Sequence, residues 1–159
     1  MTPNEILALF PGSKNDAELQ AEISRPPRAH GNSSFVIRPE KYENKAEYLT
    51  ISQITVSLLD GRVSRLTIGY KGPQWRHIDE FVSKFVEGTV FPAADQWQPY
   101  AGLDEQMKTL TCADFSIQIF AGGEGGSLNY VQLQDLEADK KLKERRKKAA
   151  EAASPSPSQ

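Results

Sequence analysis

The sequence predicts an α+β protein, with an antiparallel sheet of about six strands and helices packed on one face. Runs of alternating apolar and polar residues, separated by turn residues, are typical of antiparallel strands. One clearly amphipathic helix lies between two groups of such runs, and two short helices precede the first group. The length of 159 residues suits one ordinary domain, and no apolar stretch approaches the ~20 residues that a membrane-spanning helix needs.

Two short helices are predicted at the start of the chain. Residues 2–5, Thr-Pro-Asn-Glu, form a capping box that starts the first helix at Pro3, and Pro11-Gly12 ends it. A second box at residues 15–18 starts another helix, which ends at Arg25-Pro26-Pro27. The apolar face of the first helix is expected to comprise Ile6, Leu7, Leu9 and Phe10.

The strongest strand signal is a hairpin over residues 54–70, which a brief strand at residues 35–37 precedes. A two-residue turn at Asp60-Gly61 would place Val56 opposite Arg65. A three-residue loop through Arg62 would instead place Val56 opposite Leu66 and, by the same register, Ile54 opposite Ile68. Because one face of the hairpin is buried and needs matched apolar partners, we expect the longer loop.

An amphipathic helix is predicted to begin at Gly72-Pro73 and to end at Gly88. Three strands should follow it, at residues 107–112, 115–120 and 128–133. One core between helix and sheet is expected to include Phe81, Val82, Phe85, Ile54, Val56, Leu66 and Ile68.

The predicted elements of residues 1–135 repeat one order, in which helices are followed by three strands. The residues of the two parts are not similar in sequence. We therefore predict a single α+β domain over residues 1–135, with candidate halves 1–71 and 72–135. Residues 136–159 read as a basic helix followed by a disordered Ser/Pro tail. Leu136 and Leu142 are its only large apolar residues, so the helix should fray beyond about Arg146.

The net charge of −2 is unevenly distributed along the chain. Residues 1–135, with 12 basic and 17 acidic side chains, carry −5, whereas the segment from Leu136 onward, with seven basic and four acidic ones, carries +3. An acidic body does not offer the surface that tracks phosphates, so nucleic-acid binding is not expected. A regulatory domain that uses the basic run 140–148 on nucleic acid is an alternative, although a solvated helix end is the favoured interpretation.

The titratable residues show no catalytic or metal-binding pattern, so no catalytic residue, cofactor or metal is predicted. One cysteine, Cys112, and two histidines, His30 and His77, cannot form a structural zinc site or an internal disulfide. The glycine-rich run 122–126 is expected to be a hairpin loop, because a strand rather than a helix follows it and Glu124 would repel phosphate.

The best candidates for binding residues are Phe91, Trp97 and Tyr100. They lie in the irregular segment 89–105, between the amphipathic helix and the following strands. Aromatic side chains in a loop either pack on the core as a lid or anchor a partner. Packing as a lid is the favoured interpretation.

Residues 1–6, Met-Thr-Pro-Asn-Glu-Ile, with a glycine at position 12, resemble the helix-opening motif of the SmpA/OmlA (BamE-like) family of small envelope lipoproteins. Two short helices followed by a three-stranded meander are similar to that family's fold, and the doubled pattern is similar to the tandem layout of beta-lactamase inhibitor proteins. The resemblance implies a missing leader with an export signal before Met1, and hence a periplasmic location. Without such a leader the protein would be cytoplasmic.

The sequence as a whole predicts a non-enzymatic binding or interaction module, of the cell envelope, with an unidentified protein partner and no transmembrane segment. An enzyme whose site cannot be recognised from residue spacing is the alternative. A cleft that holds two titratable groups with strongly shifted pKa values would favour the enzyme. A convex sheet with an aromatic-lined groove would favour the binding module.

Overall fold

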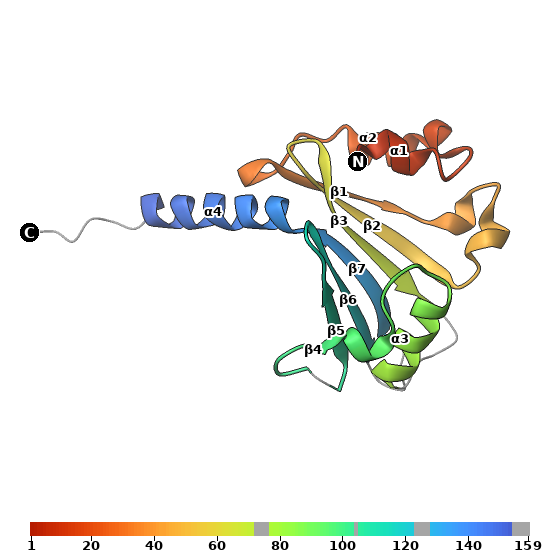
Figure 1. Cartoon of the computed structure of the whole chain (residues 1–159). Helices are drawn as coiled ribbons and strands as arrows, with labels where there is room; N and C mark the ends of the chain where they lie inside the picture. The colour runs from red at the N-terminus through yellow and green to blue at the C-terminus, as the bar shows by residue number, and fades with distance from the viewer. Residues whose placement is uncertain (72–76, 104, 123–127, 154–159) are drawn as a thin grey trace, which may run out of the picture.

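The computed structural model describes residues 1–71, 77–103, 105–122 and 128–153 (Figure 1). Its central feature is one antiparallel sheet of seven strands in the order β1-β2-β3-β7-β6-β5-β4. The predicted α+β class with an antiparallel sheet is confirmed. Helices α1, α2 and α3 lie on one face of the sheet, whereas α4 continues from the end of β7 and projects beyond it (Figure 1).

The boundaries of the elements follow the sequence pattern closely. The helices are α1 (Pro3–Leu7), α2 (Ala17–Ile23), α3 (Ile78–Glu87) and α4 (Leu136–Ala153). The strands are β1 (Asn32–Ile37), β2 (Ile51–Leu59), β3 (Arg62–Tyr70), β4 (Gln98–Pro99), β5 (Met107–Thr111), β6 (Phe115–Gly122) and β7 (Leu128–Asp135). The short 3-10 turns are η1 (Ser13–Asn15), η2 (Ala29–Gly31), η3 (Pro39–Lys41), η4 (Lys45–Tyr48) and η5 (Ala94–Gln96).

The start of α3 and the presence of an edge strand differ from the prediction. Helix α3 begins at Ile78 rather than at Gly72-Pro73, because the N-cap residue His77 has an extended backbone; residues 72–76 lie outside the described ranges. The additional strand β4 pairs with β5 through only two residues, Gln98 and Pro99. Such a short edge strand leaves little alternating pattern in the sequence.

The predicted capping box of the first helix is present, whereas the second helix is capped by Asp16, one residue after the Asn15 that the predicted box places at the N-cap. The backbone N–H of Thr2 donates to the Glu5 carboxylate at 2.5 Å, and the Asp16 carboxylate accepts from the backbone N–H of Leu19 at 3.1 Å. Helix α1 ends at Leu7, earlier than the predicted end at Pro11-Gly12. As a result, Leu9 is 58% exposed and does not belong to the apolar face predicted for it.

The expected register of the hairpin is confirmed, but a different turn produces it. Val56 lies opposite Leu66 and Ile54 opposite Ile68. Asp60 and Gly61 form a two-residue turn with φ of 52° and 77°, and the pairing then shifts between Ser57 and Leu58. A β-bulge thus supplies the extra residue that the sequence places in the loop.

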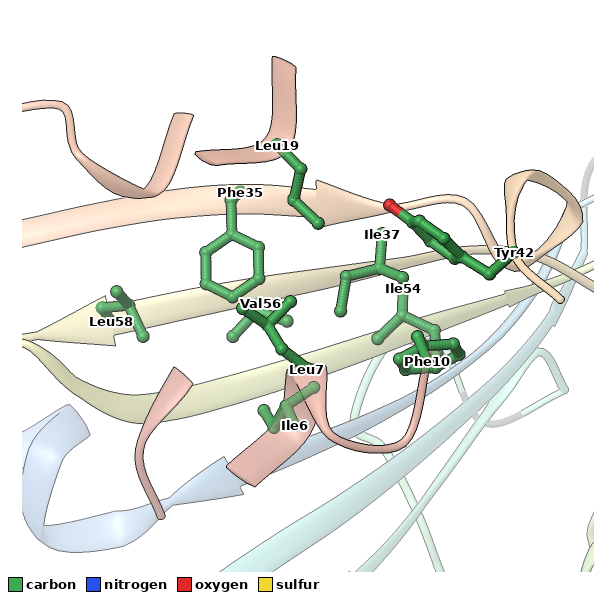
Figure 2. Close-up of a cluster of buried hydrophobic side chains, with 10 residues drawn as sticks. All are labelled: Ile6, Leu7, Phe10, Leu19, Phe35, Ile37, Tyr42, Ile54, Val56 and Leu58. Carbon is green, nitrogen blue, oxygen red and sulfur yellow. The ribbon is translucent and has the colours of Figure 1, made fainter. Parts of the chain in front are cut away.

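The single core predicted between helix and sheet is instead two clusters on the same face of the sheet. The first lies under α1 and α2 (Figure 2) and consists of Ile6, Leu7, Phe10, Leu19, Phe35, Ile37, Tyr42, Ile54, Val56 and Leu58, with Leu66 and Ile68 packed against it. The second lies under α3 and includes Phe81, Val82, Trp97, Ile117, Ile119 and Val131.

The division of the core follows from strand order. Strands β3 and β7 pair in the middle of the sheet, with Leu66 opposite Leu133 and Ile68 opposite Val131. Each group of strands is therefore covered by the helices that precede it in the chain. Helix α3 packs on β6 and β5, so it does not reach Ile54 and its neighbours.

Candidate interaction surface

The sheet face opposite α1, α2 and α3 carries polar side chains in register across six of its seven strands. Side chains alternate between the two faces of a strand. The residues on either side of a core residue therefore point to the face opposite the helices. The register joins one row of residues, all partly or fully exposed, in the order Val36, Thr55, Thr67, Gln132, Gln118, Thr109 and Gln98. Every member except Val36 has a neutral hydroxyl or amide group, so the row is polar but uncharged.

Hydrogen bonds between side chains connect the middle of this row. The Thr67 hydroxyl donates to the Gln132 amide oxygen at 3.4 Å, and the Gln132 amide nitrogen donates to the Gln118 oxygen at 3.1 Å. The same nitrogen lies 3.4 Å from the amide oxygen of Gln134. Cross-strand partners of this kind hold the amide groups in fixed orientations.

An aromatic row runs beside the polar one on the same face. Tyr130 lies opposite Phe120, and Phe120 lies opposite Met107. The rings of Phe120 and Tyr130 stack with centroids 5.1 Å apart and an interplanar angle of 15°. Partial burial raises the pKa of the Tyr130 hydroxyl.

Tyr100 continues the aromatic row at the edge of the sheet. Its backbone N–H donates to the Met107 carbonyl at 3.0 Å, which extends the β4–β5 pairing by one residue. Tyr100 follows Gln98 by two positions, so the two side chains belong to the same face of the sheet. Tyr100 is 45% exposed. We call the following residues the open patch: Thr67, Gln118, Gln132, Tyr100, Phe120 and Tyr130.

The other two aromatic residues proposed for binding are placed differently. Trp97 is only 2% exposed, and its indole N–H donates to the Pro92 carbonyl at 3.1 Å. Phe91 stacks on Phe85 of α3, with ring centroids 5.9 Å apart. Both residues pack on the second core, as the lid interpretation expects, and of the three only Tyr100 is exposed.

Helix α4 is attached to the β2–β3 turn through Asp60. Arg145 donates from its two terminal nitrogens to the two carboxylate oxygens of Asp60, each at 2.8 Å, and Lys141 donates to one of them at 2.7 Å. Arg145 also donates to the carbonyl of His30 at 2.7 Å. The hydrogen bonds from Arg145 and then Lys141 hold the pKa of Asp60 well below its usual range.

The sequence identifies Asp60 as a turn residue but does not reveal its partners. Asp60 does occupy a turn in the left-handed region, with φ of 52°. Its partners Lys141 and Arg145 lie 81 and 85 positions away, in a run of cations with no local feature that distinguishes them.

A second group of titratable residues with shifted pKa values joins α2 to η3. The Tyr42 hydroxyl donates to Asp16 at 3.0 Å, and burial together with this bond raises the pKa of Tyr42 to about 12. Lys41 donates to Glu18 at 2.8 Å, which lowers the pKa of Glu18. The cavity beside them measures only ≈ 10 Å³, about the space of one water, so it has no room for a substrate.

The remaining candidates occupy ordinary positions. Cys112 is half-buried against the second core, and His77 is exposed at the N-cap of α3.

Within the described ranges, no three His, Cys, Asp or Glu side chains are arranged to hold a metal ion. None of the helices in those ranges combines the length and apolar composition needed to cross a bilayer. The glycine-rich loop lies largely outside the described residues, since only Gly122 is placed there.

Comparison with known proteins gave no match among family models, curated proteins or solved structures. The fold and the surface themselves define the class: an α+β protein whose seven-stranded antiparallel sheet has helices α1, α2 and α3 on one face and rows of neutral polar and aromatic side chains on the other.

Proposed function

We propose that this protein is a non-enzymatic binding module that holds a folded protein partner on the open patch. The observation that supports this function is the stacked pair Phe120 and Tyr130, aligned with the exposed Tyr100 on the sheet face opposite α1, α2 and α3. Tyrosine and phenylalanine are enriched at the centres of protein interfaces, where they bury a large area with few rotatable bonds.

The shape and charge of the open patch favour a protein over a small molecule. Small-molecule sites are concave, and none of the cavities described for this protein is lined by a residue of the open patch. Seven strands at about 4.8 Å spacing make a face ~29 Å wide, which is sufficient for the ~800 Å² that each partner buries in a standard interface. The neutral amides and hydroxyls can pair with backbone or side-chain groups of the partner at little desolvation cost.

Site-specific photo-crosslinking tests the proposal. Benzoylphenylalanine at position 130 or 100 should give one defined crosslinked product in cells of the source organism. The same group at position 49, where Leu49 is 70% exposed at the end of η4 and is not part of the open patch, should not give that product. Crosslinks of equal yield and identity from all three positions would contradict a specific surface.

The partner identified in this way then allows a binding measurement with purified proteins. Tyr100→Ala and Tyr130→Ala should each weaken binding by at least about tenfold, because each removes an aromatic side chain from the open patch. Leu49→Ala is the matched control and should leave the dissociation constant unchanged. Tyr100 is 45% exposed and belongs to neither core cluster, so its replacement separates lost binding from lost folding. An unchanged dissociation constant for both tyrosine variants would overturn the proposal.

A location in the cell envelope is part of this proposal, and the resemblance to the SmpA/OmlA family supports it. Fractionation of cells of the source organism, with the native protein detected by antibody, tests it directly. Native protein found only in the cytosolic fraction would leave the binding function standing but would remove its envelope setting.

A further inference from the structure

A cavity of ≈ 280 Å³ lies between α4 and the β1–β3 part of the sheet. Four cationic side chains line it: Arg28 before η2, Arg65 of β3, and Lys143 and Arg146 of α4. The same cavity is lined by the hydroxyl-bearing residues Ser33, Ser34, Ser57 and Ser64. Asp139 is the only acidic residue among the lining residues, so the walls carry a net charge of +3.

The protein balances only part of the positive charge of this cavity, because Asp139 is the one carboxylate among the lining residues. Asp139 pairs with Lys143 at 2.6 Å and lies 3.9 Å from Arg65. In the described part of the chain, no carboxylate lies within ion-pair distance of Arg28 or Arg146. The Nε atom of Arg65 is buried and has no hydrogen-bond partner there. An unpaired buried donor on a cation is costly, and an anion with several acceptor oxygens would satisfy it.

The arrangement of α4 explains how distant cations line one cavity. Ala138, Asp139, Leu142, Lys143 and Arg146 recur at the spacing of a single helix face, and all of them line the cavity. The bonds from Lys141 and Arg145 to Asp60 hold the helix in this orientation. Arg65 and Arg28 then complete the cavity from the sheet and from the segment before η2.

We propose that this cavity binds the phosphate group of a small phosphorylated ligand. Arginine donates in a planar fork that matches phosphate oxygens, and serine hydroxyls supply further donors. The cavity volume is close to the smallest volumes of small-molecule sites in proteins, so the cavity suits a phosphate with a small attached group. The cavity shares no residue with the open patch, although its lining residue Gln134 accepts a hydrogen bond from Gln132 of that patch, and this proposal does not depend on the proposed protein partner.

Titration of the full chain with inorganic phosphate, followed by calorimetry and by amide NMR shifts at low ionic strength, tests the site. Saturable binding is expected, with the largest shifts at residues that line the cavity. Arg28→Gln and Arg146→Gln should each weaken binding by about fivefold or more, since each removes a charged donor. Arg25→Gln, in the same segment as Arg28, and Lys140→Gln, on α4, are matched controls that remove the same charge from residues that do not line the cavity.

Equal losses from the site variants and their controls would show general attraction to a basic surface and would overturn the proposal. Absence of saturable phosphate binding to the parent protein would overturn it as well. Circular dichroism of each variant separates lost binding from lost folding, and both arginines are exposed, so their replacement should not unfold the chain.

Two further probes distinguish the sources of the phosphate. Glycerol 3-phosphate represents a soluble ester, and vesicles of phosphatidylcholine with phosphatidic acid represent a lipid headgroup. Tighter binding of the soluble ester than of inorganic phosphate, lost in Arg146→Gln, would identify a soluble ligand. Vesicle binding that requires phosphatidic acid and is lost in Arg146→Gln would identify the headgroup. If the parent protein binds inorganic phosphate but neither glycerol 3-phosphate nor the vesicles, the proposal that the cavity holds a phosphorylated ligand is overturned.

Discussion

Arg145 holds both carboxylate oxygens of Asp60 at 2.8 Å, across 85 positions of the chain. Asp60 lies in the tight β2–β3 turn, and Arg145 lies more than two turns into α4. A bidentate arginine–carboxylate pair fixes direction as well as distance. The pair therefore ties α4 to the β2–β3 turn, and the cations Lys143 and Arg146 of the same helix line the cavity.

Replacement of this pair should loosen α4 without unfolding the body. In Asp60→Asn the two donors lose their charged acceptor, so amide hydrogens of residues 138–146 should exchange with solvent faster, while those of β6 and β7 keep their protection. Hydrogen exchange followed by mass spectrometry measures this directly. Glu144→Gln removes a carboxylate from α4 itself and is the matched control, which should leave the protection unchanged. Equal protection in Asp60→Asn and the parent would show that other contacts hold the helix.

The attachment of α4 should also depend on pH in a defined direction. The pKa of Asp60 is lowered in the folded protein, so its bonds stabilise the attachment above the unfolded pKa of about 3.9. This contribution is lost as the pH falls through the lower folded value. Amide protection of α4 should thus be the same at neutral and mildly acidic pH and should fall only in strong acid. In Asp60→Asn this acid-dependent step should be absent, and its persistence there would assign it to another group.

The two core clusters should unfold together, because β3 and β7 pair across the boundary between them. Phe35→Ala in the first cluster and Phe81→Ala in the second each remove a side chain that is almost fully buried. Each should lower the free energy of unfolding by ~3 to 5 kcal/mol in a single denaturant transition. Leu9→Ala, at the exposed leucine, should leave stability unchanged. Two separate transitions in either phenylalanine variant would show that the halves are independent.

Removal of the end of the chain should not affect stability. The residues of α4 that bond to Asp60, Lys141 and Arg145, come before position 147. Deletion of residues 147–159 should therefore leave the melting temperature within error. Deletion of residues 137–159 should lower it, since the bonds to Asp60 are then lost. A loss of several degrees in the shorter deletion would show that the last residues dock on the body.

Much of the local structure could be predicted from the sequence, because it depends on residues close together in the chain. The capping box at Thr2 follows from a short-range hydrogen-bonding pattern, which also places the cap of α2 within one residue of Asp16, and the composition after Leu136 indicates α4. The register of Val56 against Leu66 follows from the need to match apolar residues on one buried face, whichever turn delivers it.

Features that depend on strand order could not be predicted in this way. The pairing of β3 with β7 divides the expected single core into two clusters, and nothing in either strand's own pattern specifies its neighbour. The aromatic row likewise needs β4, β5, β6 and β7 side by side before Tyr100 aligns with Phe120 and Tyr130.

The sequence by itself determined the α+β class, the caps, the hairpin register and the basic character of α4. Only the tertiary structure decided that Asp60 would bond Arg145 and that Arg28, Arg65 and Arg146 would line one cavity. The physical reason is that periodicity and capping report interactions within a few residues. Contacts across 85 positions are instead selected by the packing of the whole chain, and surface cations leave no pattern that shows which carboxylate they will reach.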